Sequence, residues 1–534
     1  MHIHLREPKR KAYALFVDFA RAFPSIPHSK LWAKLYKLGV SSKILTLLQN
    51  LYQSAKTVIR LNEGSSEPVD ITIGLLQGDS LSPLLFSLYI NDIEKGLSES
   101  GIAGIALNHK TQLHCLLFAD DTVVLAPTEG ALQKKINLLE DYFDSLDLEL
   151  NLEKTKVVVF RRGGQLPRNL RFYFKNQLIQ IVTEYVYLGI MMSSSAIFRK
   201  QMTRANRRAA QVCHTVLKLI FRTKLSNFHS HYTLFESVIK STLLYGCGVW
   251  AQRYKQDLEP IQNNFYRRLL GLHPKLPTAI IRAETGSNHL EISIWEQTLN
   301  FLGKIRRMEQ TRYAAIIFRR LFQLDKWTDT PEYNWVTQLK LGLRPFGLED
   351  ILTTAPEDFL LMYQVSMQII EEHFQDHDKY LLERQPNNPQ YKEFRYDYDQ
   401  MQPEIQKDEK RTRWARLPWH LQQELEMSTK RFVSQLRQNS MFTRVGEGVV
   451  IVPHPSEDKM CLLCNRQGTD CLVHTIFECP VTAVSTADLR KLGWTADNFM
   501  KCLDEPCDDI KRVYELVRQC FKTRQFMTAE AEKQ

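Results

Sequence analysis

The segment that most constrains the fold is LLFADDTVVLA, residues 116–126, in which two adjacent carboxylates stand between two apolar arms. Each arm has the composition of a buried strand. An ionised carboxylate is costly to bury unless it is paired or bound to a metal, and two adjacent ones repel each other. A plain turn is the alternative, although the favoured two-residue hairpin turns carry Asn-Gly or Asp-Gly rather than Asp-Asp. Asp120 and Asp121 therefore indicate a hairpin tip that holds a cation or faces water.

Strand and helix patterns alternate unevenly over the first 190 residues, which predicts an α+β core with an antiparallel sheet. The run YALFVDFA, residues 13–20, reads as a buried strand that ends near Asp18. If this strand neighbours the hairpin, Asp18, Asp120 and Asp121 converge at one edge of the sheet. Such a set of carboxylates suits hard divalent cations, and two such cations support an in-line phosphoryl transfer.

The chain has 534 residues, which is too long for one ordinary core and predicts two to four domains. Its net charge of +10 weakly favours a polyanionic partner. No apolar run is long enough to span a membrane, and the first residues do not resemble a signal peptide. We therefore expect an intracellular protein without a membrane partner.

Seven of the ten cysteines follow residue 460, which favours a local metal site over a disulfide framework. Cys461, Cys464, His474 and Cys479 have the spacing of a closed, tetrahedral and structural zinc site. Cys471 competes for one ligand position, and reduced, unpaired cysteines are the alternative. Three further cysteines show no such pattern and are interpreted as ordinary, namely Cys502, Cys507 and Cys520.

Five motifs in order along the chain resemble those of reverse transcriptases. LLFADD resembles their catalytic hairpin, ALFVDFARAFPSIPH their first catalytic motif, and GLLQGDSLSPLLFSLYINDI the next one. LELNLEKTKVVVF and EYVYLGIMMS resemble the two motifs that follow the hairpin. The motifs are most similar to those of LINE-type (non-LTR) retrotransposon enzymes of the jockey kind, whose chains often end in a Cys-Cys-His-Cys knuckle. The resemblance covers roughly residues 13–290 and one motif of the tail.

This resemblance implies a right-hand polymerase. Residues 1–192 would form the palm, residues 193–382 a mostly helical thumb and connection, residues 383–413 a polar linker, and residues 414–534 a C-terminal region with the zinc knuckle. By position in the motifs, Asp18, Asp120 and Asp121 would hold two magnesium ions. The structural Zn²⁺ would be held by the cysteine and histidine set of the tail.

Further roles are implied by position. Phe23 falls where the family has a steric gate that selects deoxynucleotides, and a core aromatic is the alternative. Gln77 and Gly78 fall in the motif near the template base and the incoming nucleotide. Lys154 matches a lysine that protonates the leaving pyrophosphate, with Lys156 as a substitute and a solvated lysine as the alternative. Ser80, Ser82 and Pro83 are interpreted as helix-start chemistry.

The stretch 199–224 is rich in Lys and Arg and contains no acid. Lys200, Arg204, Arg207 and Arg208 lie three or four residues apart, so they can share one helical face. In a polymerase thumb this face would contact the duplex backbone, whereas a solvated surface helix is the usual alternative.

The function expected from the resemblance is RNA-directed DNA polymerisation by target-primed reverse transcription, with an RNA template, a DNA primer or target and deoxynucleoside triphosphates, in the nucleus and cytoplasm. A catalytically inactive remnant that still binds nucleic acid, and an RNA-dependent RNA polymerase, are the alternatives. Two departures matter. Pro24 replaces an acid usual in the first motif, and Met1 lies 17 residues before Asp18. We therefore expect a truncated copy, without an upstream endonuclease or most of the fingers, that extends primers poorly.

Overall fold

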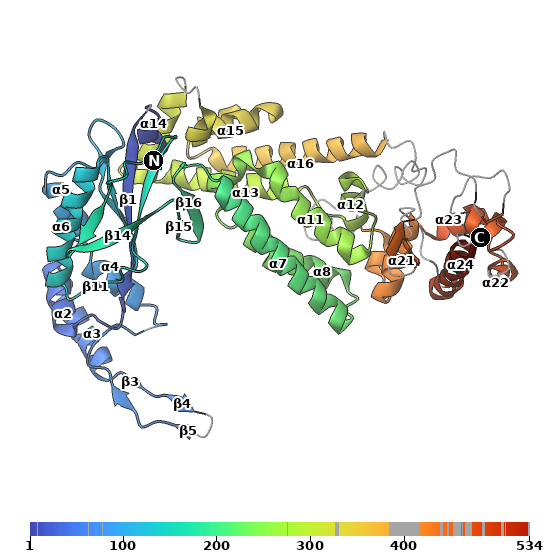
Figure 1. The fold of residues 1–534 in the computed structure, drawn as a ribbon, viewed down its shortest axis with the longest axis horizontal. Helices are drawn as coiled ribbons and strands as arrows, with labels where there is room; N and C mark the ends of the chain where they lie inside the picture. Colours follow the sequence, from blue (N-terminus) through green and yellow to red (C-terminus); the bar gives the residue numbers. More distant parts are fainter. Residues whose placement is uncertain are drawn as a thin grey trace. The chain divides into compact units, whose positions relative to one another are not determined.

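The computed structural model describes residues 1–383 except 8, 62–63, 77, 275 and 326–329, and then 417–437, 442–445, 448–451, 461, 463–464, 473–482, 486–503, 507 and 509–531. The predicted linker lies almost entirely outside these residues. The chain divides into two compact units, one of Met1–Gln201 with Leu302–Arg344 and one of Met202–Phe301 with Pro345–Gln534 (Figure 1). Of the helices that the structure describes, none has the length and apolarity that a membrane crossing requires.

Unit 1 is built on a six-stranded sheet with the strand order β13-β14-β12-β1-β10-β9 (Figure 1). The strands are β1 (Lys11–Val17), β9 (Cys115–Phe118), β10 (Asp121–Ala126), β12 (Lys156–Arg161), β13 (Phe172–Phe174) and β14 (Gln177–Val182). The central strand β1 is buried on both faces from Ala12 onward, which fits its almost continuously apolar sequence. It pairs antiparallel with β10, the neighbour expected from the hairpin, and also antiparallel with β12. The sheet is nevertheless mixed, because β12 pairs parallel with β14.

Helices cover the sheet face that carries Tyr13, Leu15 and Val17. They are α2 (His28–Lys37), α3 (Ser42–Gln53), α4 (Ser82–Tyr89), α5 (Ile93–Glu99) and α6 (Glu129–Ser145). The sequence predicted one helix through LLFSLYINDIEKGL, and the structure breaks it at residues 90–92 into α4 and α5. Pro83 stands in the first turn of α4, as predicted, because a missing N–H costs nothing there.

The opposite sheet face carries Ala12, Ala14 and Phe16 and packs against α1 (His2–Leu5) and α14 (Tyr313–Asp325). The hairpin of β15 (Glu184–Tyr187) and β16 (Ile190–Ser193) also covers this face, and Tyr185 stacks on Phe16 at 4.4 Å between ring centroids. Shorter strands complete the unit in pairs: β2 (Phe19–Ala20) with β11 (Glu149–Leu150), β3 (Lys56–Thr57) with β6 (Val69–Asp70), β4 (Arg60–Leu61) with β5 (Gly64–Ser65), and β7 (Ile105–Ala106) with β8 (Gln112–Leu113).

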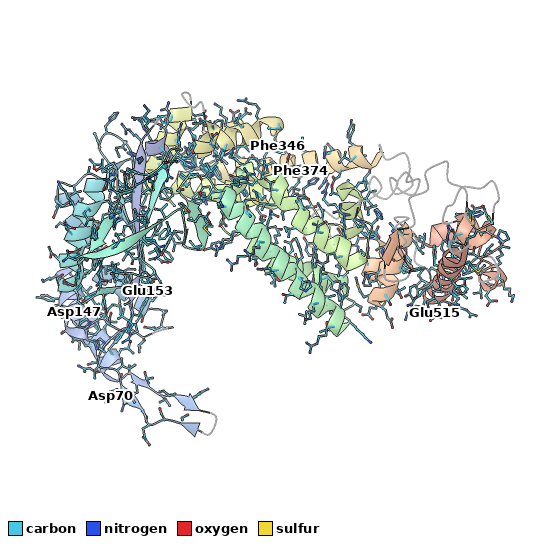
Figure 2. The ribbon with its side chains drawn as sticks, viewed as in Figure 1. Asp70, Asp147, Glu153, Phe346, Phe374 and Glu515 are labelled. Atoms are coloured by element: carbon cyan, nitrogen blue, oxygen red, sulfur yellow. The ribbon has the colours of Figure 1, made fainter. Side chains whose placement is uncertain are left out.

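Unit 2 is mainly helical in the part that the structure describes. Its longer helices are most of α7 (Arg199–Thr223), α8 (Phe228–Leu234), α11 (Lys255–Leu270), α12 (Thr278–Thr285), the first part of α13 (Leu290–Arg307), α16 (Phe359–Glu383), α21 (Met427–Arg437) and α24 (Ile510–Ala531). One core lies among α7, α11 and α12, and a second lies between α21 and α24. Phe346 and Phe374 (Figure 2) contribute a ring contact at 6.0 Å.

Candidate active site and metal centre

The register of β1 and β10 brings Asp18 and Asp121 to the same end of the sheet. Val17 pairs with Thr122, so Asp18 and Asp121 occupy the next position on each of the two neighbouring strands. On the other side of β10, Phe118 pairs with Asp121, which leaves Ala119 and Asp120 as the two-residue turn. Ala119 has φ of 49°, the left-handed conformation that such turns require. Asp120 therefore lies in the turn, whereas Asp121 is the first residue of β10.

The three carboxylates share one electrostatic environment. Burial raises the pKa of Asp121, and the negative charges of Asp120 and Asp18 raise it further. Burial also raises the pKa of Tyr185, and the negative charges of Asp18 and Asp121 raise it further. A cation bound among the acids would relieve this repulsion. In the described part of the chain, the carboxylate oxygens of these three aspartates do not all lie within 4.8 Å of one another.

The main chain of Asp18 is fixed by the segment before β12. The Asp18 amide donates to Thr155 Oγ1 at 3.1 Å, and the Asn151 amide donates to the Asp18 carbonyl at 2.8 Å. Thr155 is fully buried. Sequence reasoning missed its role, because nothing in the motif around Lys154 indicates that Thr155 contacts Asp18.

Lys154 lies beside the first acid, with its Nζ 3.7 Å from Asp18 Oδ2. Its side chain is 68% exposed, so the amine can move toward a bound ligand. Its neighbour Glu153 is exposed in the same loop (Figure 2). Lys156 pairs across the sheet with Phe16, two residues before Asp18. The structure therefore places Lys154 in contact with Asp18, and Lys156 in strand β12.

Phe23 is partly buried and stacks on Phe86, with the ring centroids 5.2 Å apart. Its backbone carbonyl accepts from the Leu75 amide at 2.8 Å. The neighbouring Pro24 approaches Gly74 so closely that a Cβ at Gly74 would lie 2.7 Å from the Pro24 carbonyl oxygen. Gly74 also has φ of +90°, so this position requires glycine. The Pro24 departure is thus matched by a glycine on the facing loop.

The next predicted motif is described only in part. Gly78 has φ of +89° and open space around it, which allows a ligand to approach its backbone. Gln77 lies outside the described residues. Ser82 is the first residue of α4 and donates to the Leu76 carbonyl at 2.6 Å, but it does not cap the helix, whose N-cap residue is Leu81.

Along α7, the structure leaves Arg207 and Arg208 exposed and Arg204 partly buried. Lys200, predicted to share their face, pairs with Glu184 at 3.0 Å. Two of the four predicted basic side chains are therefore exposed to solvent.

The four predicted zinc ligands converge. One ligand atom from each of Cys461, Cys464, His474 and Cys479 lies within 4.8 Å of every other. Cys461 Sγ is 4.0 Å from Cys479 Sγ, and Cys464 Sγ is 3.4 Å from His474 Nε2. His474 Nδ1 lies 3.4 Å from Glu478 Oε2, which is the outer carboxylate contact typical of metal-bound histidines. The competitor Cys471 lies outside the described residues.

The family model described as "Reverse transcriptase (RNA-dependent DNA polymerase)" matches residues 2–192, the part that contains all three aspartates. Residues 2–192 are therefore a reverse transcriptase domain. Its matched segment ends at the β15–β16 hairpin and includes the whole six-stranded sheet.

Curated relatives are proteins of non-LTR retrotransposons. The chain is 26% identical over 304 residues to a Pol polyprotein from the type-1 retrotransposable element R2 of Popillia japonica, covering 55% of this chain and 41% of the relative. It is 31% identical over 207 residues to the R2DM polyprotein of Drosophila melanogaster, covering 37% and 19%. It is 22% identical over 275 residues to the RNA-directed DNA polymerase from mobile element jockey of Drosophila funebris, covering 50% and 29%. The chain thus spans less than half the length of these relatives.

Among solved structures, a telomerase from Candida albicans in complex with a fragment of telomeric RNA is similar, with 13% identity, a TM-score of 0.25, and coverage of 57% of this chain and 49% of that one. A similarity at this level does not bear on the fold of this chain.

Proposed function

We propose that this chain is the RNA-directed DNA polymerase of a non-LTR retrotransposon, acting by magnesium-dependent nucleotidyl transfer in target-primed reverse transcription. The observation that supports this most is the register that sets Asp18, directly after β1, beside Asp121, the first residue of β10, with Asp120 in the adjoining turn. This proposal makes residues 1–192 a right-hand palm and residues 193–382 a thumb and connection.

The residues fit two magnesium ions, because three carboxylates lie at one end of the sheet, where burial and the charges of its two neighbours raise the pKa of Asp121. When bound, the ions supply activation of the attacking primer oxygen and stabilisation of the leaving oxygen. Asp18, Asp120 and Asp121 hold negative charge where these ions would be ligated. Thr155 keeps the Asp18 main chain in place.

Lys154 holds a proton within reach of the same site, since its Nζ lies 3.7 Å from Asp18 Oδ2. In this proposal it donates that proton to the departing pyrophosphate. Phe23 presents a ring fixed by Phe86, and this ring would exclude a ribose 2′-hydroxyl. Gly78 leaves space for the nucleotide, and Gln77 would complete that contact.

The remaining parts would grip nucleic acid. The exposed arginines of α7 suit the phosphate backbone of a primer-template duplex. The cluster of Cys461, Cys464, His474 and Cys479 has the donor set and convergence of a structural zinc knuckle. The proposed partners are an RNA template, a DNA primer and deoxynucleoside triphosphates.

The test is primer extension on an RNA template with deoxynucleotides and Mg²⁺. Asp18→Asn and Asp120→Asn should each reduce extension by about 10²–10³-fold or more, because each removes charge from the reacting centre. Asp141→Asn is the matched control, since Asp141 is an exposed residue of α6. Primer-template binding, measured in parallel, should be unchanged in all three variants.

Two outcomes would replace the proposal. Binding of primer-template without extension by the unmutated chain would favour an inactive remnant that retains nucleic-acid binding. Extension with ribonucleotides as readily as with deoxynucleotides would favour an RNA-dependent RNA polymerase. Phe23→Ala separates this second case, because a steric gate predicts that the variant gains ribonucleotide incorporation.

A further inference from the structure

A basic pocket of about 540 Å³ lies in unit 1, between the N-terminal segment, the loop after β7, the end of β12 and α14. Four arginines line it, namely Arg6, Arg10, Arg162 and Arg320, against one acidic residue, Glu7. Glu7 is engaged by Arg10 at 2.5 Å. The lining therefore carries a clear excess of positive charge.

The pocket is distinct from the aspartate site. Lys11 pairs with Arg161 at the start of β1, which sets Arg10 and Arg162 beside each other there. Asp18 follows the last residue of the same strand. At about 3.3 Å per residue, the separation between Arg10 and Asp18 along the strand corresponds to about 26 Å, so the two sites lie at opposite ends of β1.

Arg162 gives the pocket its strongest indication of a ligand. Its Nε and NH2 are buried, and among the described residues neither has a hydrogen-bond partner. Its guanidinium lies 4.4 Å from the centroid of the Tyr333 ring. Tyr333 is itself held by a hydrogen bond from its hydroxyl to the Ser195 carbonyl at 3.1 Å. The guanidinium is therefore preorganised with donors unused, and a buried donor without an acceptor is destabilising.

Arg320 supplies a second such group from α14. Its Nε is buried without a partner among the described residues, and its NH1 makes only a long contact of 3.4 Å with Gln323 Oε1. Arginine presents a planar fork of donors that matches phosphate oxygens, and clustered arginines repel one another unless an anion joins them. A doubly charged anion would accept hydrogen bonds from the unused donors and would offset the repulsion between the arginines.

We infer that this pocket is a phosphate-binding site, sized for one phosphate ester group with its attached nucleoside and held chiefly by Arg162 and Arg320. The phosphate belongs either to a nucleic-acid strand or to a free nucleotide. The site does not depend on polymerase activity, because the aspartates contribute nothing to it.

The test is equilibrium dialysis of the full chain, without Mg²⁺, against inorganic phosphate and adenosine 5′-monophosphate. Arg162→Gln and Arg320→Gln should each weaken binding about tenfold or more, since a hydrogen bond to a charged group is lost. Arg162→Lys should retain part of the affinity. Arg168→Gln is the matched control, because Arg168 is exposed on the same sheet's connecting loop and does not line the pocket.

Equal binding by all variants, or no measurable binding of either probe to the unmutated chain, overturns the inference. Arg320 and Arg162 lie on different elements, so if one variant fails to fold, the other variant still tests the inference. Two competition experiments identify whether the bound phosphate belongs to a nucleic-acid strand or to a free nucleotide. Displacement of bound phosphate by a short single-stranded oligoribonucleotide indicates a strand, whereas displacement by adenosine 5′-monophosphate alone indicates a free nucleotide.

Discussion

Asp18 is positioned by β1 and also by polar contacts with residues that follow β11. Thr155 binds its amide and Asn151 its carbonyl, so the backbone of the first acid is fixed where the strand pairing with β10 ends. The sequence indicated Asp18 because it ends an apolar run. It could not indicate Thr155, because a contact across 137 residues has no local pattern.

Thr155→Val tests this positioning role. The substitution keeps the shape of a fully buried side chain but leaves the Asp18 amide without its acceptor, which should cost about 1 kcal/mol of stability. We expect primer extension to require more Mg²⁺ than in the unmutated chain. Thr285→Val is the control, since Thr285 is also buried and hydrogen-bonded but lies in unit 2. A similar change in Mg²⁺ dependence in both variants would reduce Thr155 to a general packing role.

Asp121→Asn should stabilise the metal-free chain at neutral pH while impairing extension. Burial and two neighbouring acids raise the folded-state pKa of Asp121, so its ionised form is disfavoured in the folded chain. The folded state therefore loses stability as pH rises from the unfolded value, about 4, through the raised value. The gain from Asp121→Asn should be present above that window and vanish below it. Thermal unfolding against pH measures this, with Asp141→Asn, on the exposed face of α6, measured in parallel.

At the scale of elements, local patterns predicted β1 and the β9–β10 hairpin, because each has an apolar composition typical of buried strands. Two features were not predictable in this way. The break between α4 and α5 occurs inside a run that reads as helical throughout, and β14 adds in parallel to β12 through a non-local pairing. The convergence of Cys461, Cys464, His474 and Cys479 could be predicted because their spacing is itself the signal, whereas their role as zinc ligands stays a prediction.

The basic face of α7 predicts a salt-dependent contact. Arg207→Gln combined with Arg208→Gln should weaken primer-template binding and lower the slope of log affinity against log salt by about 2, since two phosphate contacts are lost. Fluorescence anisotropy over a salt series measures both quantities. Arg168→Gln combined with Arg171→Gln removes the same charge from exposed positions of unit 1. An equal change of slope in the two double variants would indicate a general charge effect.

Glu478 should support the zinc cluster from outside. Its carboxylate lies 3.4 Å from His474 Nδ1, and such outer contacts orient the imidazole and strengthen it as a ligand. Glu478→Gln should weaken zinc affinity by about 10-fold or more without removing a ligand. Metal analysis after dialysis against graded chelator measures this. Cys461→Ser should lose the metal and Cys520→Ser should keep it. Retention by Cys461→Ser would show that another residue, such as Cys471, completes the site.

At the scale of the whole molecule, the two units have separate apolar cores, and unit 2 also has a buried polar centre. Glu284 of α12 lies 3.2 Å from both Arg437 Nε and His420 Nε2, and all three side chains are almost completely buried. Arg437 also donates to the Leu503 carbonyl at 2.6 Å. This centre ties α12 to α21 and to the cysteine-rich part of the same unit. The sequence did not reveal it, because its members are far apart along the chain.

We predict that the two units unfold in separate transitions and that Glu284→Gln lowers only one of them. Burial tends to raise the pKa of Glu284, but Arg437 and His420 outweigh it, so the folded-state pKa is lowered. The ion pair thus adds stability to the folded state above the unfolded pKa of Glu284, near 4, and this stability is lost as pH falls.

At neutral pH, Glu284→Gln leaves Arg437 buried without its counter-ion and should cost about 3–5 kcal/mol in unit 2. Leu139→Ala, in the core of unit 1, should cost about 2–5 kcal/mol and lower the other transition. Calorimetry of the full chain distinguishes the cases, because a single transition that shifts in both variants would mean that the units fold as one.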